Sequence, residues 1–248
     1  MTDLLPPALY VTGTDTGIGK TFSSCVLLHA LRRRGATALG MKPVASGCVR
    51  TAQGLRNDDA SALLAASYPA PAYADLNPYA LPLPLAPELA AADAGVSLAL
   101  APIEAAFARL RAQADHVVVE GVGGWLAPLS ATLDQADLVG ALRLPVLMVV
   151  GLRLGCLNHA RLTAAAIAAS GAQCIGWIAN EVDPAMARID DNVAMLQARL
   201  PMPCWGRLPY APGADPASLA GHLHGAVQAG PPSSSAQASC PTVAIAAT

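Results

Sequence analysis

Short apolar runs alternate with longer segments rich in alanine and leucine along most of the chain. The runs with the length and composition of buried strands are residues 8–12, 37–41, 116–120, 145–150, 174–179 and 204–208. Helix-like stretches lie between most of these runs. Such alternation predicts a single α/β domain, built on a parallel β-sheet with helices on both faces. Because ligands bind beyond the carboxyl ends of the strands in such sheets, the residues that follow each run are the candidates for function.

The first apolar run leads into a glycine-bearing turn within the segment VTGTDTGIGKT. A turn of this kind between a strand and a helix is typical of a backbone cradle for nucleotide phosphates, because its N–H groups and the positive helix start attract anions. In this interpretation Lys20 reaches the β and γ phosphates and Thr21 binds Mg²⁺. The helix is expected to run from Thr21 to a stop at Gly35. The usual spacing has four residues between the first glycine and the Gly-Lys pair, whereas five separate Gly13 from Gly19.

Two carboxylates are candidate partners of a magnesium nucleotide, which needs hard oxygen ligands beyond one threonine. Glu120 ends a fully apolar run, where a carboxylate is costly unless it is paired or bound to a metal. Asp59 lies near a helix start in the segment GLRNDDASAL. The alternative, that Asp58 and Asp59 cap this helix, is equally open.

Four further positions follow apolar runs. Lys42, in GMKPVASG, is either a second cation over the transferring phosphoryl group or ordinary surface charge. Ser46 donates to a substrate oxygen or stabilises a turn. Backbone amides of residues 155–158 form an anion site suited to a carboxylate, unless Asn158 simply caps a helix. Asn180 reads a purine edge or is a turn residue.

Composition excludes several classes of function. The formal net charge of −2 provides no basic surface for nucleic acid. The apolar run LPVLMVVGL is far shorter than the ~20 residues of a membrane span, and no export signal is recognisable, so we expect a cytoplasmic protein without membrane contact. The six cysteines contain no Cys-x-x-Cys pair, and we expect reduced thiols, with Cys25 and Cys174 in the core. His222 and His224 alone are weak evidence for a metal.

Two segments differ from the rest in composition. Prolines are frequent in residues 68–88, so we expect neither a regular helix nor a central strand there, but an ordered loop near the site. Residues 225–248 read as a flexible tail, which leaves residues 1–224 as the folded domain.

Taken together, these residues resemble the dethiobiotin synthetases, the ATP-dependent enzymes of biotin biosynthesis. The resemblance extends over about residues 8–210 and rests on VTGTDTGIGKT, KPVASG, GLRNDDA, NPY, VEGVGGWLAPL, LPVLMVVGLRLGCLNHARLTA and GWIAN in one order. The long spacing from Gly13 to Gly19 is also a feature of that family. The resemblance implies a P-loop NTPase-like fold and a homodimer that places its substrate carboxylate site at the interface.

The reaction that the resemblance implies is closure of a ureido ring. In that family, 7,8-diaminononanoate and CO₂ give a carbamate, which ATP phosphorylates to a carbamic-phosphoric anhydride. The second amine then closes the ring, and dethiobiotin, ADP and phosphate are released. The expected partners are therefore these small molecules together with ATP and Mg²⁺.

The resemblance also assigns roles residue by residue. Lys20 and Lys42 neutralise the phosphates and the carbamate. ATP contacts fall on Gly13, Thr14, Asp15, Thr16, Gly17, Ile18, Gly19, Lys20, Thr21, Asn180 and Pro209. Mg²⁺ contacts fall on Thr21, Asp59 and Glu120. Substrate contacts fall on Thr16, Lys42, Ser46, Gly155, Cys156, Leu157 and Asn158.

The chain departs from the pattern of this family at two positions, and one other function competes with this interpretation. Gly17 stands where some members carry an acidic residue, and Glu88 stands where some carry a histidine, so no role is assigned to Glu88. The competing hypothesis is a ParA/MinD-like switch ATPase that acts through protein partners. Proteins of that kind typically carry an extra lysine early in the phosphate loop, whereas this chain has Gly13-Thr14-Asp15.

Overall fold

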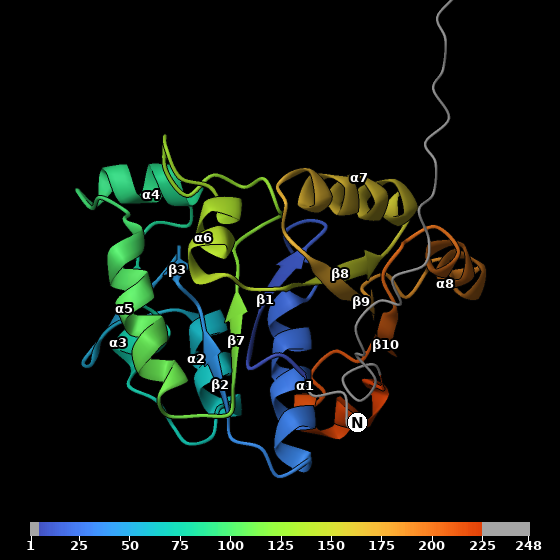
Figure 1. The fold of residues 1–248 in the computed structure, drawn as a ribbon, viewed down its shortest axis with the longest axis horizontal. Coiled ribbons are helices and arrows are strands. Elements are labelled where there is room, and N and C mark those ends of the chain that lie inside the picture. The colour runs from blue at the N-terminus through green and yellow to red at the C-terminus, as the bar shows by residue number, and fades with distance from the viewer. Residues whose placement is uncertain (1–4, 225–248) are drawn as a thin grey trace, which may run out of the picture.

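The computed structural model describes residues 5–224. A six-stranded sheet in this part of the chain has the order β10-β9-β8-β1-β7-β2, and every pairing in it is parallel (Figure 1). Its strands are β1 (Ala8–Gly13), β2 (Ala38–Met41), β7 (His116–Glu120), β8 (Val146–Leu152), β9 (Cys174–Glu181) and β10 (Cys204–Leu208). All six predicted strands are therefore confirmed; β7 and β10 have the predicted ends, and the ends of the other four differ by at most two residues.

Helices cover both faces of the sheet, as predicted. The helices are α1 (Lys20–Arg33), α2 (Asp58–Ala66), α3 (Tyr73–Leu76), α4 (Pro87–Asp93), α5 (Leu100–Arg111), α6 (Gln135–Leu142), α7 (Cys156–Ala169), α8 (Ile189–Gln197) and the 3₁₀ helix η1 (Pro216–His222). One core cluster contains apolar residues of α1 and α2, and the other contains residues of α4 to α8. Alternate residues of β1 point into the two clusters: Leu9 and Val11 into the first, Ala8 and Tyr10 into the second. Burial on both faces explains why the strands read as continuous apolar runs.

Two small sheets lie beside the large one. Strands β3 (Val44–Ala45) and β6 (Tyr79–Ala80) pair in parallel, and β4 (Val49–Thr51) with β5 (Gly54–Arg56) forms a hairpin. The proline-rich residues 68–88 thus contain β6, the one-turn helix α3 and the start of α4, which corrects the expectation of a loop without a helix. A single turn fits between the prolines, and Pro87 occupies the first turn of α4, where no N–H is needed.

The described cysteines are free thiols, as expected. Cys25 is buried, and burial raises its pKa to about 12. Cys174 is only half-buried at the rim of the core, which corrects its expected core position. Residues 5–224 contain no group of three His, Cys, Asp or Glu side chains that would hold a metal. Cys240 and the expected tail, 225–248, lie outside the described residues.

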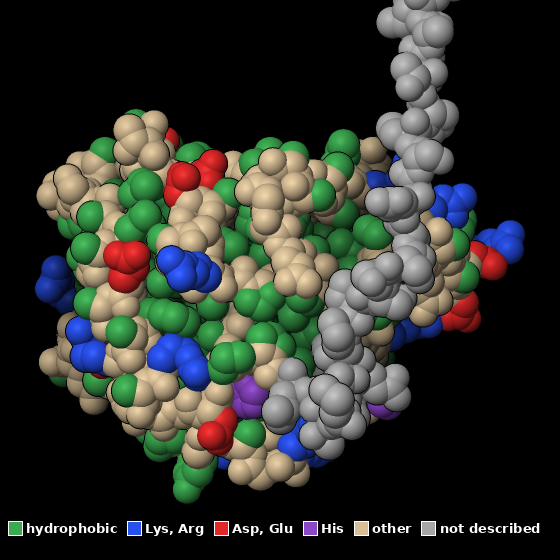
Figure 2. All heavy atoms as spheres, in the orientation of Figure 1, with side chains coloured by type: hydrophobic (Ala, Val, Ile, Leu, Met, Phe, Trp, Pro, Cys, Tyr) green, Lys and Arg blue, Asp and Glu red, His purple; other side chains and the backbone are tan. Residues whose placement is uncertain are grey.

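Surface charge is mixed. On the face drawn in Figure 2, Lys and Arg side chains are interspersed with Asp and Glu rather than gathered into a patch of one sign. No helix in the described part of the chain has the length and hydropathy needed to cross a bilayer.

Candidate functional site

A cavity of about 750 Å³ opens at the carboxyl ends of β1, β2 and β7. The arrowheads of β1 and β7 in Figure 1 point toward this edge of the sheet. Most of the residues predicted to bind nucleotide, metal or substrate near the phosphate loop line the cavity: Thr16, Gly17, Gly19, Lys20, Thr21, Lys42, Ser46 and Asp59. The segment 84–87 forms part of the opposite wall, so the proline-rich stretch is ordered and lies at the site, as predicted.

The phosphate loop, Gly13–Gly19, joins β1 to α1. Gly17 and Gly19 have φ values of 71° and 80°, a backbone region that favours glycine. Gly19 is the N-cap of α1, so the helix begins at Lys20, one residue earlier than predicted. Gly35 follows the end of α1 with a φ of 82°, which confirms the predicted stop.

The side chain of Asn180, from β9, packs against the phosphate loop. Its Nδ2 donates to the carbonyl of Ile18 at 2.8 Å, and the side chain is buried. A Cβ on Gly19 would lie 2.1 Å from this Nδ2, so only glycine fits there. Asn180 therefore fixes the loop, and one of its two amide hydrogens is already used in doing so.

Lys20 lies buried at the start of α1. Its Nζ donates to the carbonyl of Asp15 at 2.9 Å, within the phosphate loop itself. Burial, together with the nearby charge of Lys42, lowers the pKa of Lys20 to about 8. A phosphate held by the loop would place a negative charge beside Lys20 and favour its charged form.

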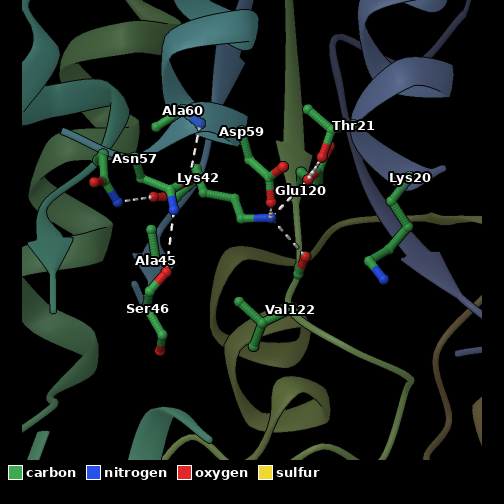
Figure 3. Close-up of polar contacts among 12 residues, drawn as sticks. Lys20, Thr21, Lys42, Ala45, Ser46, Asn57, Asp59, Ala60, Glu120 and Val122 are labelled. Atoms are coloured by element: carbon green, nitrogen blue, oxygen red, sulfur yellow. Dashed lines mark hydrogen bonds and ion pairs between the residues drawn. The ribbon is translucent and has the colours of Figure 1, made fainter. Parts of the chain in front are cut away.

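Lys42 is the centre of a buried ion cluster. Its Nζ lies 2.6 Å from Glu120 Oε1 and 2.9 Å from Asp59 Oδ2 (Figure 3). Burial opposes the charge on Lys42, but the two carboxylates outweigh it and raise the pKa of Lys42 above its usual value. For Asp59 burial likewise opposes the charge, and Lys42 outweighs it and lowers the pKa. The alternative of an ordinary surface lysine is therefore wrong.

Thr21 joins the same cluster. Its Oγ1 donates to Glu120 Oε1 at 2.7 Å, so the three residues predicted to bind metal come together around one point. Glu120 is fully buried, and its Oε2 has no hydrogen-bond partner. The carboxylates of Asp59 and Glu120, including the unpartnered Oε2 of Glu120, and the hydroxyl of Thr21 are hard oxygen ligands, so these residues fit Mg²⁺.

Helix α2 explains how Asp59 reaches the cluster. Asn57 is the N-cap, and its Oδ1 accepts from the N–H of Ala60 at 3.2 Å. The capping role considered for Asp58 and Asp59 is therefore wrong, because Asn57 fills it and leaves Asp59 free to turn toward Lys42. Asn57 Nδ2 also donates to the carbonyl of Ser46. The Oγ of Ser46 is buried without a partner at the cavity wall, which makes it available to a ligand.

The predicted carboxylate site lies outside this cavity, at the start of α7. Gly155 is its N-cap, with a φ of 95°, so the alternative of Asn158 as the cap is wrong. The N–H of Cys156 already donates to the carbonyl of Arg153, which leaves the amides of Leu157 and Asn158 as first-turn donors. Arg153 forms an ion pair with Asp15, which ties the loop before α7 to the phosphate loop.

Pro209 follows β10, next to Asn180 on β9. The N–H of the adjacent Tyr210 donates to Glu181 Oε2 at 3.3 Å, and this bond fixes the exit of β10. Pro209 does not line the cavity described above.

Sequence reasoning missed several residues of the site. Val122 and Gly123 form a wall of the cavity, and Asn57 and Arg153 hold its parts together. The signal for Arg153 was its place just after an apolar run, where side chains reach the site edge. The sequence did not distinguish Asn57 from the two aspartates that follow it as a cap of α2. Lys20 and Lys42 are also the only lysines among the 248 residues.

Comparison with known proteins shows the family to which this chain belongs. A family model described as an AAA domain matches residues 7–218. A curated relative from Xanthomonas oryzae pv. oryzae (strain PXO99A), named ATP-dependent dethiobiotin synthetase BioD, is 75% identical over 215 residues, which cover 87% of this chain and 96% of the relative. The chain belongs to the dethiobiotin synthetase family. A member from Xylella fastidiosa (strain 9a5c) with the same name is 66% identical over 88% of this chain and 96% of the relative. The predicted resemblance is confirmed.

Solved structures show the fold. A ParA family ATPase from Chlorobium tepidum TLS has a TM-score of 0.51 and 11% identity, over 88% of this chain and 90% of that one. At this identity the likeness confirms the P-loop NTPase-like fold. It adds no support to the alternative of a switch ATPase, because fold and function are separate properties.

The ion cluster yields a prediction about stability. Lys42→Met leaves Glu120 buried without its cation, and we expect the free energy of unfolding to fall by about 3–5 kcal/mol. Urea unfolding followed by circular dichroism measures this change. Arg109→Ala is the control, because it breaks an exposed pair with Asp75 and is expected to cost less than about 1 kcal/mol. Equal losses in the two variants would show that the cluster does not stabilise the fold.

Proposed function

We propose that this chain is an ATP-dependent dethiobiotin synthetase that closes the ureido ring of 7,8-diaminononanoate with CO₂. The observation that carries the proposal is the meeting of the phosphate loop with Lys42, Thr21, Asp59 and Glu120 at one cavity. The names of relatives that cover nearly the whole domain support the same activity. The diamine, CO₂ and ATP are the proposed substrates.

The proposed chemistry needs positioning and charge rather than a nucleophilic side chain. One amine of the substrate takes up CO₂ as a carbamate and loses a proton. A carbamate oxygen then attacks the γ phosphorus of ATP, and the bond from this phosphorus to the β–γ bridging oxygen breaks to release ADP. The second amine then attacks the carbamoyl carbon of the mixed anhydride, so that the C–O bond to phosphate breaks and the ring closes. Aligned substrates and cationic groups are sufficient for transfer of this kind.

The phosphate loop and the two lysines hold the phosphates in this proposal. Amides of Gly13–Gly19 and the start of α1 bind the phosphate oxygens. Lys20 exchanges the carbonyl of Asp15 for the β and γ phosphates. Lys42 faces the carbamate and the transferring phosphoryl group, where its charge balances the growing negative charge.

Magnesium completes the set of cations in the proposal. Thr21, Asp59 and Glu120 would hold Mg²⁺. When bound, it supplies positive charge beside the phosphates.

The remaining contacts position the two substrates. Thr16 and Ser46, at the cavity wall, hold the diamine or its carbamate. Asn180 and Pro209 lie at the ends of β9 and β10, where we place the adenine. Amides of residues 155–158 at the start of α7 bind the substrate carboxylate.

A second copy of the chain is part of the proposal. Leu154, just before α7, is 95% exposed, and Leu162 on α7 is 62% exposed. Large apolar side chains so exposed beside a proposed substrate site favour a partner surface. We expect a homodimer in sedimentation velocity, and Leu154→Asp is expected to shift it toward monomer. A wild-type chain that sediments as a monomer at assay concentration would contradict this arrangement.

Lys20 provides a test of the site. We expect Lys20→Ala to lower kcat/KM by about 10²-fold or more, the scale for removing one electrostatic donor to the transition state. Phosphate release at matched folded concentration measures the loss, with Arg109→Ala as a control variant away from the cavity. Turnover near that of the wild type would remove Lys20 from the mechanism.

The activity itself is tested by dependence on the diamine. Phosphate release from ATP with Mg²⁺ and bicarbonate is measured with and without 7,8-diaminononanoate, and mass spectrometry follows dethiobiotin. We expect phosphate release that requires the diamine and matches the product mole for mole. ATP hydrolysis that ignores the diamine, without a ureido product, would favour the switch ATPase instead.

A further inference from the structure

Gln135 is fully buried, and its side-chain amide bonds to the backbone of the loop that contains the cavity-lining residue Val122. It begins α6, and its Oε1 accepts from the hydroxyl of Tyr10 and from the N–H of Val122 at 3.0 Å. Its Nε2 donates to the carbonyl of Val122 at 2.7 Å and to the carbonyl of Gly124. One side chain thus makes three bonds to the backbone of a single loop.

Helix α6 does not need this side chain for its own start. Asp134 is the N-cap, and it forms a reciprocal capping box with Asp137. A buried apolar residue at position 135 would therefore satisfy the helix equally well. An amide in this position costs free energy unless its hydrogen bonds are all made, so its partners indicate its role.

The loop that Gln135 holds, residues 121–124, lies between the metal-ligand candidate Glu120 and the phosphate loop. It follows Glu120 directly, and Val122 and Gly123 line the cavity. A Cβ on Gly123 would lie 3.5 Å from Thr16 Oγ1. The loop therefore faces the phosphate loop across the site.

Three of the four residues in this loop are glycines, so its own backbone imposes few constraints. Gly123 has a φ of 55°. Gly121 is packed so closely that a Cβ would lie 2.1 Å from the hydroxyl of Tyr10 and 2.2 Å from Gln135 Oε1. Gln135 makes three hydrogen bonds to the backbone of this loop, whereas Lys42 makes one, to the carbonyl of Gly121.

We propose that Gln135 is a positioning residue, which clamps residues 121–124 so that Glu120 and the cavity wall stay aligned with the phosphate loop. Tyr10, on β1, orients the Gln135 side chain because its hydroxyl donates to Gln135 Oε1. The kinetic consequence rests on the proposed function, whereas the structural consequence, local order of the loop, does not.

The test compares three variants of the full-length protein. Gln135→Met removes all the polar bonds at nearly constant volume, and Tyr10→Phe removes one bond while the loop contacts remain. Gln113→Met is the matched control, because this glutamine is exposed in the turn after α5 and its side-chain amide donates to the carbonyl of Arg109, away from the cavity. Hydrogen exchange by mass spectrometry is measured without ligand, and steady-state kinetics are measured with ATP, Mg²⁺, bicarbonate and the diamine.

For Gln135→Met we expect amides of residues 121–124 to exchange at least about tenfold faster, while those of β8 keep their wild-type rates. We expect kcat/KM to fall by about 10- to 100-fold, mainly through KM, and Gln113→Met to match the wild type. Tyr10→Phe is expected to change the same segment by less, and it keeps the test available if Gln135→Met does not fold.

Two results would overturn the proposal. The first is unchanged exchange in residues 121–124 of both Gln135→Met and Tyr10→Phe. The second is faster exchange spread evenly over the whole sheet, which would mean that Gln135 only stabilises the core. If the wild type lacks diamine-dependent turnover while local exchange changes as expected, the proposed function fails and the clamp stands.

Discussion

The site depends on one constraint, the carboxylate of Glu120 at the buried end of a central strand. A carboxylate cannot stay charged there without partners, because the loss of water is not otherwise compensated. Lys42 and Thr21 provide those partners from β2's carboxyl end and from α1. The pairing β2-β7-β1 in the sheet is what brings these three elements together. The same electrostatic need that stabilises the fold therefore assembles the groups that we propose to hold a magnesium nucleotide.

Glycine allows close packing of the backbone on both sides of the cavity. In the phosphate loop, Gly19 makes room for Asn180, and the loop is fixed by this contact and by the bond from Lys20 to Asp15. Across the cavity, the loop after Glu120 needs glycine for close packing, and a buried amide on another helix holds it. Both walls are thus backbone surfaces ordered by side chains that lie outside the cavity or at its edge.

Much of this architecture could be predicted from the sequence, and the reasons are physical. Strands buried on both faces read as apolar runs, and a glycine-bearing turn that leads into Lys20 and a helix is typical of phosphate binding. The role of Asn57 could not be predicted, because Asn57, Asp58 and Asp59 are equally good N-caps and the sequence does not fix which of them begins the helix. Gln135 gave no signal at all, since its partners are mostly backbone atoms, and these do not depend on residue type. The one-turn helix α3 was missed because prolines limit a helix's length without excluding a single turn.

The distribution of amino groups has a separate consequence. Because the sequence has only two lysines and both are at the cavity, all other basic side chains apart from histidine are arginines. Arginine stays protonated at any pH at which the protein is handled, and it does not react with acylating reagents as an amine does. Apart from the chain's α-amino group, acylation of amines is therefore confined to the cavity. Lys42 is held charged by Glu120 and Asp59, so we expect it to be the less nucleophilic of the two. Beyond the α-amino group, we therefore expect covalent labelling of amines to report on Lys20 and on whatever shields it.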